Sequence, residues 1–303
     1  MEHESGESAT RTERRTLRVD GHDRTYEVVS TDASDRRPRA LLLALHGSNQ
    51  DAAKLRAMSG GTFDDLASSH DAVVVYPEAY KGLWNDARTS MASPARREGI
   101  DDVAFLAAVV AAVTDDHGPL PVFVAGYSNG GQLAIRLVHE RPELLSGAVL
   151  VGATQPTADV FAVARDAERP LPVVVIHGTR DPIVPYAGGT ASLFGFRPRG
   201  TGLSAPDTAA YYARRNGIGT PPVVERLPHE ARSGRTSVTL SRWAEPGRPT
   251  VALYTVDGGG HTVPNRRHRA FRLLGRTTHD LDAGAVVGRL IDDTDPTAPP
   301  GVS

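Results

Sequence analysis

Short runs of aliphatic residues, separated by polar segments, are the feature that most restricts how this chain can fold. Valine and leucine dominate these runs, and polar residues mostly do not alternate with apolar ones inside them. A strand that is apolar on both faces has to be covered on both faces, which is typical of a buried parallel sheet. The runs expected to form strands are "ALLLAL" (40–45), "AVVVY" (72–76), "PVFVAG" (121–126), "GAVLVG" (147–152), "PVVVIHG" (172–178) and "TVALYTV" (250–256).

Two of the segments between these runs have the spacing of helices. In "DDVAFLAAVVAAV" (101–113), Val103, Leu106 and Val110 recur at helical intervals, and the aspartates at its start can cap a helix. "NGGQLAIRLVHERP" (129–142) is expected to be a second helix that stops before its last proline. Alternating strands and helices predict an α/β fold, with a mostly parallel central sheet, right-handed crossovers and helices on both faces.

The remaining segments divide the chain into one domain and two tails. Polar sequence at 1–14 and at 293–303 predicts a disordered leader and a disordered tail. Between them, residues 15–292 are expected to form a single domain that starts with a hairpin over 16–30, turning at its Asp-Gly pair. The segment 187–249 is rich in Gly, Pro and Arg and contains one helical pattern. We expect it to be a small cap-like insertion over the carboxyl edge of the sheet.

The composition narrows the classes of function. The 303 residues include 34 Lys and Arg against 36 Asp and Glu, so no excess of charge points to nucleic acid or to a membrane surface. The absence of cysteine excludes disulfides, thiolate catalysis and cysteine metal sites. No apolar run approaches the ~18 residues of a membrane span, and the polar amino terminus lacks the apolar core of a secretory signal. We therefore expect a cytoplasmic protein without nucleic-acid or membrane partners.

Cofactors are not expected either. No spacing of ligands for a metal is present, and the "GGGH" run follows a strand but opens no helix, so it does not form a phosphate-binding loop. Nothing in the sequence indicates an oligomeric state.

One serine stands in the setting of a catalytic nucleophile. Gly126, Tyr127, Ser128, Asn129 and Gly130 match the pattern G-x-S-x-G, with an apolar strand before them and a helical pattern after them. In this context a nucleophilic serine sits on a sharp turn, and the glycines remove side chains where strand and helix cross. A glycine-rich turn that only joins strand and helix is the alternative interpretation.

A serine nucleophile needs a base, and the base needs an acid that orients it. In this architecture the order along the chain is serine, acid, histidine. Asp181 and His261 each follow the carboxyl end of a predicted strand, so their loops can meet Ser128 at one edge of the sheet. We expect Ser128, Asp181 and His261 to act together, with Asp257 as the alternative acid.

The oxyanion that forms on the attacked carbonyl needs backbone N–H donors, each of which lowers the barrier by roughly 3 kcal/mol. One donor is expected from Asn129, the residue after the nucleophile. The other is expected from the loop "HGSNQ", where Ser48 is the first choice and Asn49 the second. His46, in the same loop, and His177 are interpreted as structural hydrogen-bonding groups.

These motifs together resemble those of the α/β-hydrolase superfamily. More narrowly, they resemble the poly(3-hydroxybutyrate) depolymerase and feruloyl esterase group of carboxylic ester hydrolases. The matching pieces, in order, are "LHGSNQ", "YPEAYKGLWNDAR", "DDVAFL", "GYSNGG", "HGTRDPIVPY" and "GGGHTVP".

The resemblance implies the α/β-hydrolase fold, a triad of Ser128, Asp181 and His261, and ester hydrolysis through an acyl-enzyme. It also implies that Trp84 lies near the substrate channel, and it gives Tyr186 a similar place. A tryptophan that only packs its loop is an equal alternative for Trp84.

The chain departs from this group at three positions. Secreted members often carry cysteine where Ser48 and Ile218 stand here, and many members have an aromatic residue where Val263 follows "GGGHT". The missing cysteines argue against an extracellular polymer as substrate, and the missing ring weakens the case for an aromatic acyl group.

The expected function is therefore that of a serine carboxylic ester hydrolase acting on a small or oligomeric ester, of hydroxyalkanoate or feruloyl type. An acyltransferase or thioesterase with the same triad is an alternative, because the triad does not choose the leaving group or the acceptor. A non-catalytic ligand-binding protein of the same fold is the alternative from another class.

Overall fold

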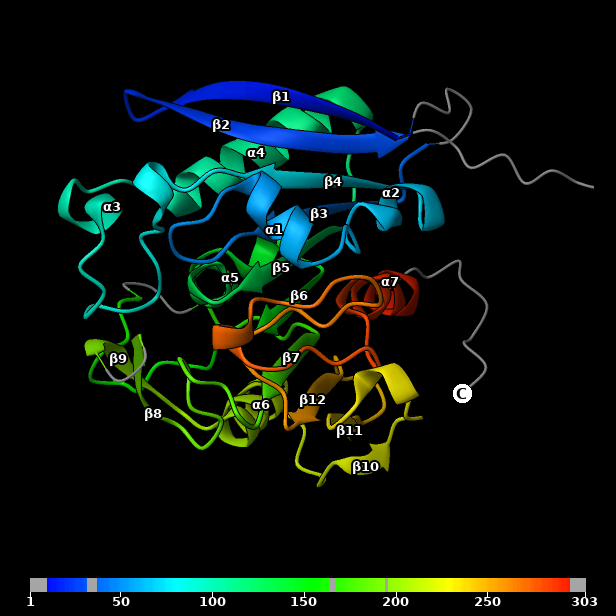
Figure 1. Cartoon of the computed structure of the whole chain (residues 1–303). Helices are drawn as coiled ribbons and strands as arrows, with labels where there is room; N and C mark the ends of the chain where they lie inside the picture. The colour runs from blue at the N-terminus through cyan, green and yellow to red at the C-terminus, as the bar shows by residue number, and fades with distance from the viewer. Residues whose placement is uncertain (1–9, 32–36, 164–166, 194–195, 295–303) are drawn as a thin grey trace, which may run out of the picture.

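A central sheet of ten strands forms where the aliphatic runs predict it (Figure 1). The computed structural model describes residues 10–31, 37–163, 167–193 and 196–294. The strand order is β1-β2-β4-β3-β5-β6-β7-β12-β11-β10, and the strands from β4 to β12 in this order run parallel. They correspond to the six predicted runs, with the bounds β3 (Ala40–Leu45), β4 (Ala72–Pro77), β5 (Val122–Tyr127), β6 (Gly147–Val151), β7 (Val173–Gly178) and β12 (Val251–Asp257).

Antiparallel strands complete the sheet at both edges. At one edge β1 (Thr10–Val19) and β2 (His22–Thr31) form the predicted hairpin, whose two turn residues both have positive φ. At the other edge β11 (Ser237–Trp243) and β10 (Val223–Arg226) are added beside β12. Figure 1 shows the strands following one another from this hairpin at the top to β10 at the bottom.

The prediction of a disordered leader over residues 1–14 is wrong for residues 10–14. Residues 10–14 belong to β1, and Thr10 pairs with Thr31 of β2. These residues are polar and exposed, but an edge strand is held by backbone hydrogen bonds to one neighbour and needs no apolar side chains. Residues 1–9 lie outside the described residues.

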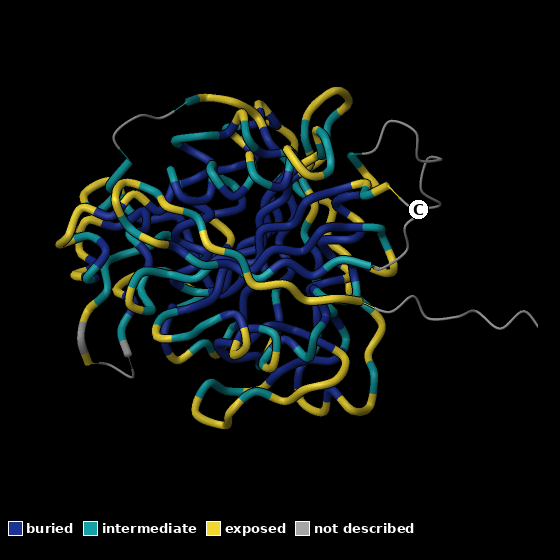
Figure 2. Tube along the Cα trace, turned by 90° about the horizontal axis from the view of Figure 1, so that it is seen from above, coloured by how far each residue is buried: buried dark blue, intermediate teal, exposed yellow. Residues whose placement is uncertain are grey.

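Helices cover both faces of the sheet, so the predicted fold class is confirmed. Leu41 and Leu43 of β3 enter a core on one face with α4, α5 and α6, while Leu42 and Ala44 enter a second core on the other face with α1, α2 and α7. Figure 2 shows the buried residues gathered at the centre of the molecule, with intermediate and exposed residues around them. The helices are α1 (Ala52–Met58), α2 (Asp65–Ser69), α3 (Pro94–Arg97), α4 (Asp102–His117), α5 (Asn129–Glu140), α6 (Ala205–Arg215) and α7 (Ala283–Thr294).

Most of the segment 187–249 does not form the predicted cap. Helix α6 packs on β7 and β12, and β10 and β11 extend the central sheet. Val238 and Leu240 of β11 alternate with more exposed residues, as in a half-buried antiparallel strand, so a polar composition there did not mean an insertion. Among the described residues of this segment, the hairpin of β8 (Gly189–Leu193) and β9 (Phe196–Gly202) forms a separate two-stranded sheet, at the lower left of Figure 1.

The predicted tail, 293–303, begins too early. Residues 293 and 294 are still in α7, and the Thr294 hydroxyl donates to the backbone oxygens of Leu290 and Ile291. Residues 295–303 lie outside the described residues. Over the described ranges, no helix has the length and apolar character that crossing a membrane requires.

Candidate active site

Ser128 lies at a sharp turn between β5 and α5. Its φ of 55° and ψ of −113° fall in a region that non-glycine residues avoid, at a cost on the order of 1–3 kcal/mol. Its backbone N–H donates to the carbonyl oxygen of Val151 in β6 at 2.9 Å, which ties the turn to the neighbouring strand. The side chain reaches a pocket at the carboxyl edge of the sheet, in the arrangement that G-x-S-x-G predicts.

The glycines around Ser128 are required by close packing. A Cβ atom on Gly126 would collide with the backbone of Gly130, and one on Gly130 would collide with the backbone of Leu45 in β3. A Cβ atom on Gly131 would lie 2.6 Å from the Cβ of Ala153. Helix α5 therefore starts closer to the sheet than side chains at these positions would allow.

Asp181 and His261 form a buried pair. Asp181 Oδ2 lies 2.6 Å from His261 Nδ1, and the two side chains are 0% and 2% exposed. Asp181 Oδ1 accepts the backbone N–H groups of Ile183 and Val184, each at 2.8 Å, which fixes the carboxyl group in its loop. Both residues follow strands of the parallel centre, β7 and β12, as predicted.

The ionisation of Asp181 determines the tautomer of His261. Burial alone would raise the pKa of the Asp181 carboxyl, but His261, His177 and the Val184 N–H outweigh it and lower this pKa below its usual value. Asp181 is therefore a carboxylate at neutral pH and can only accept hydrogen bonds. His261 Nδ1 must then be the donor, which leaves Nε2 of the neutral ring as a proton acceptor.

Contacts with β5 and β6 place His261 beside the turn that carries Ser128. A Cβ atom on Gly152 would lie 3.0 Å from the imidazole of His261, and Gly152 directly follows Val151, the acceptor of the Ser128 N–H. Tyr127 packs its ring against this imidazole with centroids 5.0 Å apart, and its hydroxyl donates to the His261 carbonyl oxygen at 2.9 Å. The structure thus brings the three predicted residues to one edge of the sheet.

Asp257, the alternative acid, is not part of this group. It is exposed at the end of β12, and its carboxylate accepts the hydroxyl of Thr179 at 3.1 Å. Asp181 takes the place beside His261 instead.

Two backbone N–H groups remain for an oxyanion. Among the described residues, no protein acceptor contacts the N–H of Ser48 or of Asn129, whereas the N–H of Asn49 donates to Gly82 O at 2.8 Å. Asn49, the second choice, is therefore engaged elsewhere. The Asn129 side chain is 1% exposed, accepts the N–H of Trp84 at 3.0 Å and donates to Asp86 at 2.6 Å, so the start of α5 is held firmly.

Neither Trp84 nor Tyr186 is among the residues that line the pocket of Ser128. Trp84 is 0% exposed, and its indole N–H donates to His46 O at 2.9 Å, so it packs inside the protein and supports the loop before Ser48. The Tyr186 hydroxyl is bonded to the Thr255 hydroxyl at 2.7 Å, and its ring packs against the core. The full burial of Trp84 fits the alternative of a tryptophan that packs its loop, whereas Tyr186 is only partly buried, and its contact with substrate stays a prediction.

His46 and His177 have the structural role predicted for them. His46 Nε2 accepts the N–H of Ala79 at 3.1 Å and its Nδ1 lies 2.8 Å from Gly47 O. His177 is fully buried, and its Nε2 lies 2.9 Å from Val184 O and 3.4 Å from Asp181 Oδ2. Burial lowers the pKa of the His177 imidazole.

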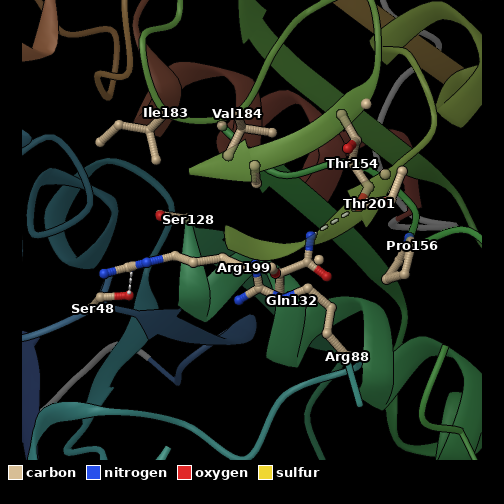
Figure 3. A pocket seen from close by; sticks show the side chains of 15 residues that line it. Ser48, Arg88, Ser128, Gln132, Thr154, Pro156, Ile183, Val184, Arg199 and Thr201 are labelled. Carbon is tan, nitrogen blue, oxygen red and sulfur yellow. Dashed lines mark hydrogen bonds between the residues drawn. The ribbon is translucent and has the colours of Figure 1, made fainter. Parts of the chain in front are cut away.

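Several lining residues of the pocket are absent from the sequence prediction (Figure 3). Arg88 lies shortly after Trp84 in the same loop, and Gln132 lies in the first turn of α5. Thr154 follows the end of β6, and Arg199 belongs to β9. No local motif indicates that an arginine of a separate hairpin is a neighbour of Ser48, so Arg199 could not be predicted from the sequence.

The described residues contain no group of three or more His, Asp or Glu side chains placed to hold a metal ion.

Comparisons with known proteins relate this chain to esterases. The model of the phospholipase/carboxylesterase family matches residues 107–193. The chain is 31% identical over 281 residues to a putative esterase, NocK, of Nocardia uniformis subsp. tsuyamanensis, and the match covers 84% of this chain and 75% of the relative. It is 25% identical over 179 residues to the bifunctional acetylxylan esterase/xylanase XynS20E of Neocallimastix patriciarum, covering 58% of this chain and 24% of that protein.

A solved structure shares the fold. An acetyl xylan esterase from Aspergillus awamori aligns with a TM-score of 0.58 at 14% identity, over 84% of this chain and 95% of that one.

Proposed function

The chain belongs to the carboxylesterases of the α/β-hydrolase superfamily, and on this basis we propose that it hydrolyses esters through an acyl-enzyme formed on Ser128. The observation that carries the proposal is the buried pair of Asp181 and His261 beside the strained turn of Ser128. A structural turn would require neither the strain nor an imidazole next to it.

In the first half of the reaction, the Ser128 hydroxyl oxygen attacks the ester carbonyl carbon while His261 Nε2 takes the hydroxyl proton. The Asp181 carboxylate keeps the proton on Nδ1 and stabilises the imidazolium that forms. When the tetrahedral intermediate collapses, the bond to the alcohol oxygen breaks and His261 returns the proton to the alcohol.

The oxyanion of this intermediate would be held by the N–H groups of Ser48 and Asn129, both without protein acceptors among the described residues. Water then attacks the acyl-enzyme, with His261 again as base, and releases the acid and the free Ser128 hydroxyl.

The substrate class rests on the resemblance seen in the motifs. We propose a small or oligomeric ester, of hydroxyalkanoate or feruloyl type, with no nucleic-acid or membrane partner. The short acyl group named for the acetyl xylan esterases makes acetyl esters a useful first probe. The cytoplasmic location stays a prediction from the sequence.

Turnover of p-nitrophenyl acetate tests the proposal. Ser128→Ala should lower kcat/KM by at least about 10³-fold, because the nucleophile is lost while the oxyanion donors remain. Ser68→Ala is the matched control, since Ser68 is exposed on α2 and its hydroxyl donates to Asp65 O in the same helix. Equal rates in both variants would discard the assignment. Adding alcohols as acceptors and identifying the products separates hydrolysis from acyl transfer.

A further inference from the structure

We propose that Gln132 determines substrate specificity and that the preferred ester carries a hydroxyl group a few bonds from its scissile carbonyl. This inference rests on the proposed function and specifies the substrate of the same site. It is carried by one acceptor oxygen that is buried at the pocket of Ser128 without a hydrogen bond, and by the contacts that fix its orientation.

Gln132 lies one helical turn after the nucleophile and lines the same pocket. Its backbone N–H donates to the carbonyl oxygen of Ser128 at 3.0 Å, and Figure 3 shows its amide group among the side chains of the pocket. Residues four positions apart on a helix lie on one face, with about 5–6 Å between their Cβ atoms. A group a few bonds from an ester carbonyl bound at Ser128 can therefore reach the Gln132 amide.

One hydrogen bond determines which way this amide is turned. Gln132 Nε2 donates to the backbone carbonyl oxygen of Thr154, after β6, at 2.8 Å. Because a carbonyl oxygen can only accept, the NH2 group must face Thr154 and Oε1 must face away from it. The backbone carbonyl oxygen of Gln132 also accepts the N–H of Ala87 at 3.3 Å, which ties the residue to the loop after Trp84.

The Oε1 atom of Gln132 is an acceptor without a donor. The residue is 5% exposed, and no N–H or O–H group of the residues that the structure describes bonds to this oxygen. An unpaired buried acceptor costs free energy, and a donor that arrives with a ligand recovers it. The pocket should therefore prefer a substrate that brings a donor to this oxygen.

The lining of the pocket favours a neutral donor. Among the described residues, those that line it include no aspartate or glutamate, so no carboxylate there would balance an ammonium group. A hydroxyl is the smallest neutral donor, and it can belong to the acid part or to the alcohol part of an ester. A site that bonds a substrate hydroxyl discriminates against the analogue without it, because the buried group of the protein is then left unpaired.

Two series of esters test this inference on the wild-type enzyme. On the acid side, p-nitrophenyl esters of 3-hydroxypropionate, butyrate and 3-methoxypropionate place a hydroxyl, a methyl group and an ether oxygen at one position. On the alcohol side, 2-hydroxyethyl, propyl and 2-methoxyethyl acetate make the same comparison, followed by acid release. Dividing each kcat/KM by the rate of hydroxide hydrolysis of the same ester removes differences in intrinsic reactivity.

In one of the two series the hydroxy ester should exceed both analogues by about 5–100-fold, the range expected for a buried acceptor left unpaired. The ether is the decisive analogue, because it keeps the oxygen and cannot donate. The series that shows the preference identifies the part of the ester that carries the hydroxyl.

Variants assign the preference to one side chain. Gln132→Met removes the amide at similar volume and should remove the preference, whereas Gln132→Glu keeps an acceptor oxygen and should retain part of it. Gln155→Met is the matched control. Gln155 is also buried, but its Oε1 accepts the Tyr212 hydroxyl at 3.1 Å and it is not among the lining residues, so the ratio should stay unchanged.

The outcomes separate this inference from the proposed function. If the wild type hydrolyses none of these esters, the proposed function fails. If it hydrolyses them without preferring the hydroxyl in either series, or accepts the ether equally well, the ester hydrolase stands and the role of Gln132 is overturned. The wild-type ratio in Gln132→Met would overturn it as well.

Discussion

At Gly152 the absence of a side chain makes room for the imidazole of His261. The backbone there has a φ of +58°, and a Cβ atom would lie 3.0 Å from Cε1 and Nδ1 of the ring and 3.8 Å from Asp181 Oδ2. A glycine is thus needed both for the conformation and for the close approach of a catalytic group.

Gly152→Ala should therefore lower kcat on p-nitrophenyl acetate by about 10–100-fold, because a small displacement of the imidazole spoils its geometry toward Ser128. Gly21→Ala is the matched control, with a φ of +80° and no atom within 4 Å of the added Cβ. Both variants should lose roughly 1 kcal/mol of stability to backbone strain, and only the first should lose activity. Equal kcat values in the two variants would show that the position of the His261 imidazole does not depend on the missing side chain at Gly152.

At the scale of elements, a buried ion pair fastens the β1–β2 hairpin to α4. Arg24 of β2 lies 2.6 Å from Asp102 at the start of α4, and the two side chains are 3% and 0% exposed. The other Asp102 oxygen accepts the N–H of Asn85 at 2.6 Å, and the guanidinium lies 4.1 Å from the ring centre of Phe105. One carboxylate therefore joins the hairpin, the helix and the loop that precedes Asp86.

Arg24→Met should lower the free energy of unfolding by about 3–5 kcal/mol, because it leaves the Asp102 carboxyl buried without its partner. Arg18→Met in the same hairpin should change it by less than about 1 kcal/mol, since the Arg18–Asp23 pair is 68% and 65% exposed. Urea unfolding of the two variants measures both values. Similar losses of unfolding free energy in both variants would contradict a stabilising role for the buried Arg24–Asp102 pair.

The elements that could be predicted are those whose pattern is local. The parallel strands are continuous apolar runs, and their bounds agree with the structure to within about one residue. Strand β11 was missed because its buried Val238 and Leu240 stand among polar residues in a segment rich in Gly, Pro and Arg. The place of Trp84 was inferred from a motif, and only the packed structure shows that the ring is fully buried.

At the scale of the whole molecule, the candidate active site depends on segments that are distant in sequence coming together in space. Asp181 and His261 are 80 positions apart in sequence and 2.6 Å apart in space, because β7 and β12 are neighbours in the parallel sheet and end at the same edge. The order of the motifs along the chain was enough to predict that Asp181 and His261 lie close together. Arg199 was not predictable, since its contact with Ser48 depends on how a hairpin outside the sheet is placed, and no local pattern encodes that placement.

The rate and site of labelling by a fluorophosphonate, followed by intact-protein mass and peptide mapping, test most directly whether His261 activates Ser128. We predict a single adduct on Ser128 in the wild type and none in Ser128→Ala. His261→Ala should label at least about 10³-fold more slowly, since the hydroxyl then lacks its base. An adduct on another residue, or labelling of His261→Ala at the wild-type rate, would contradict the account.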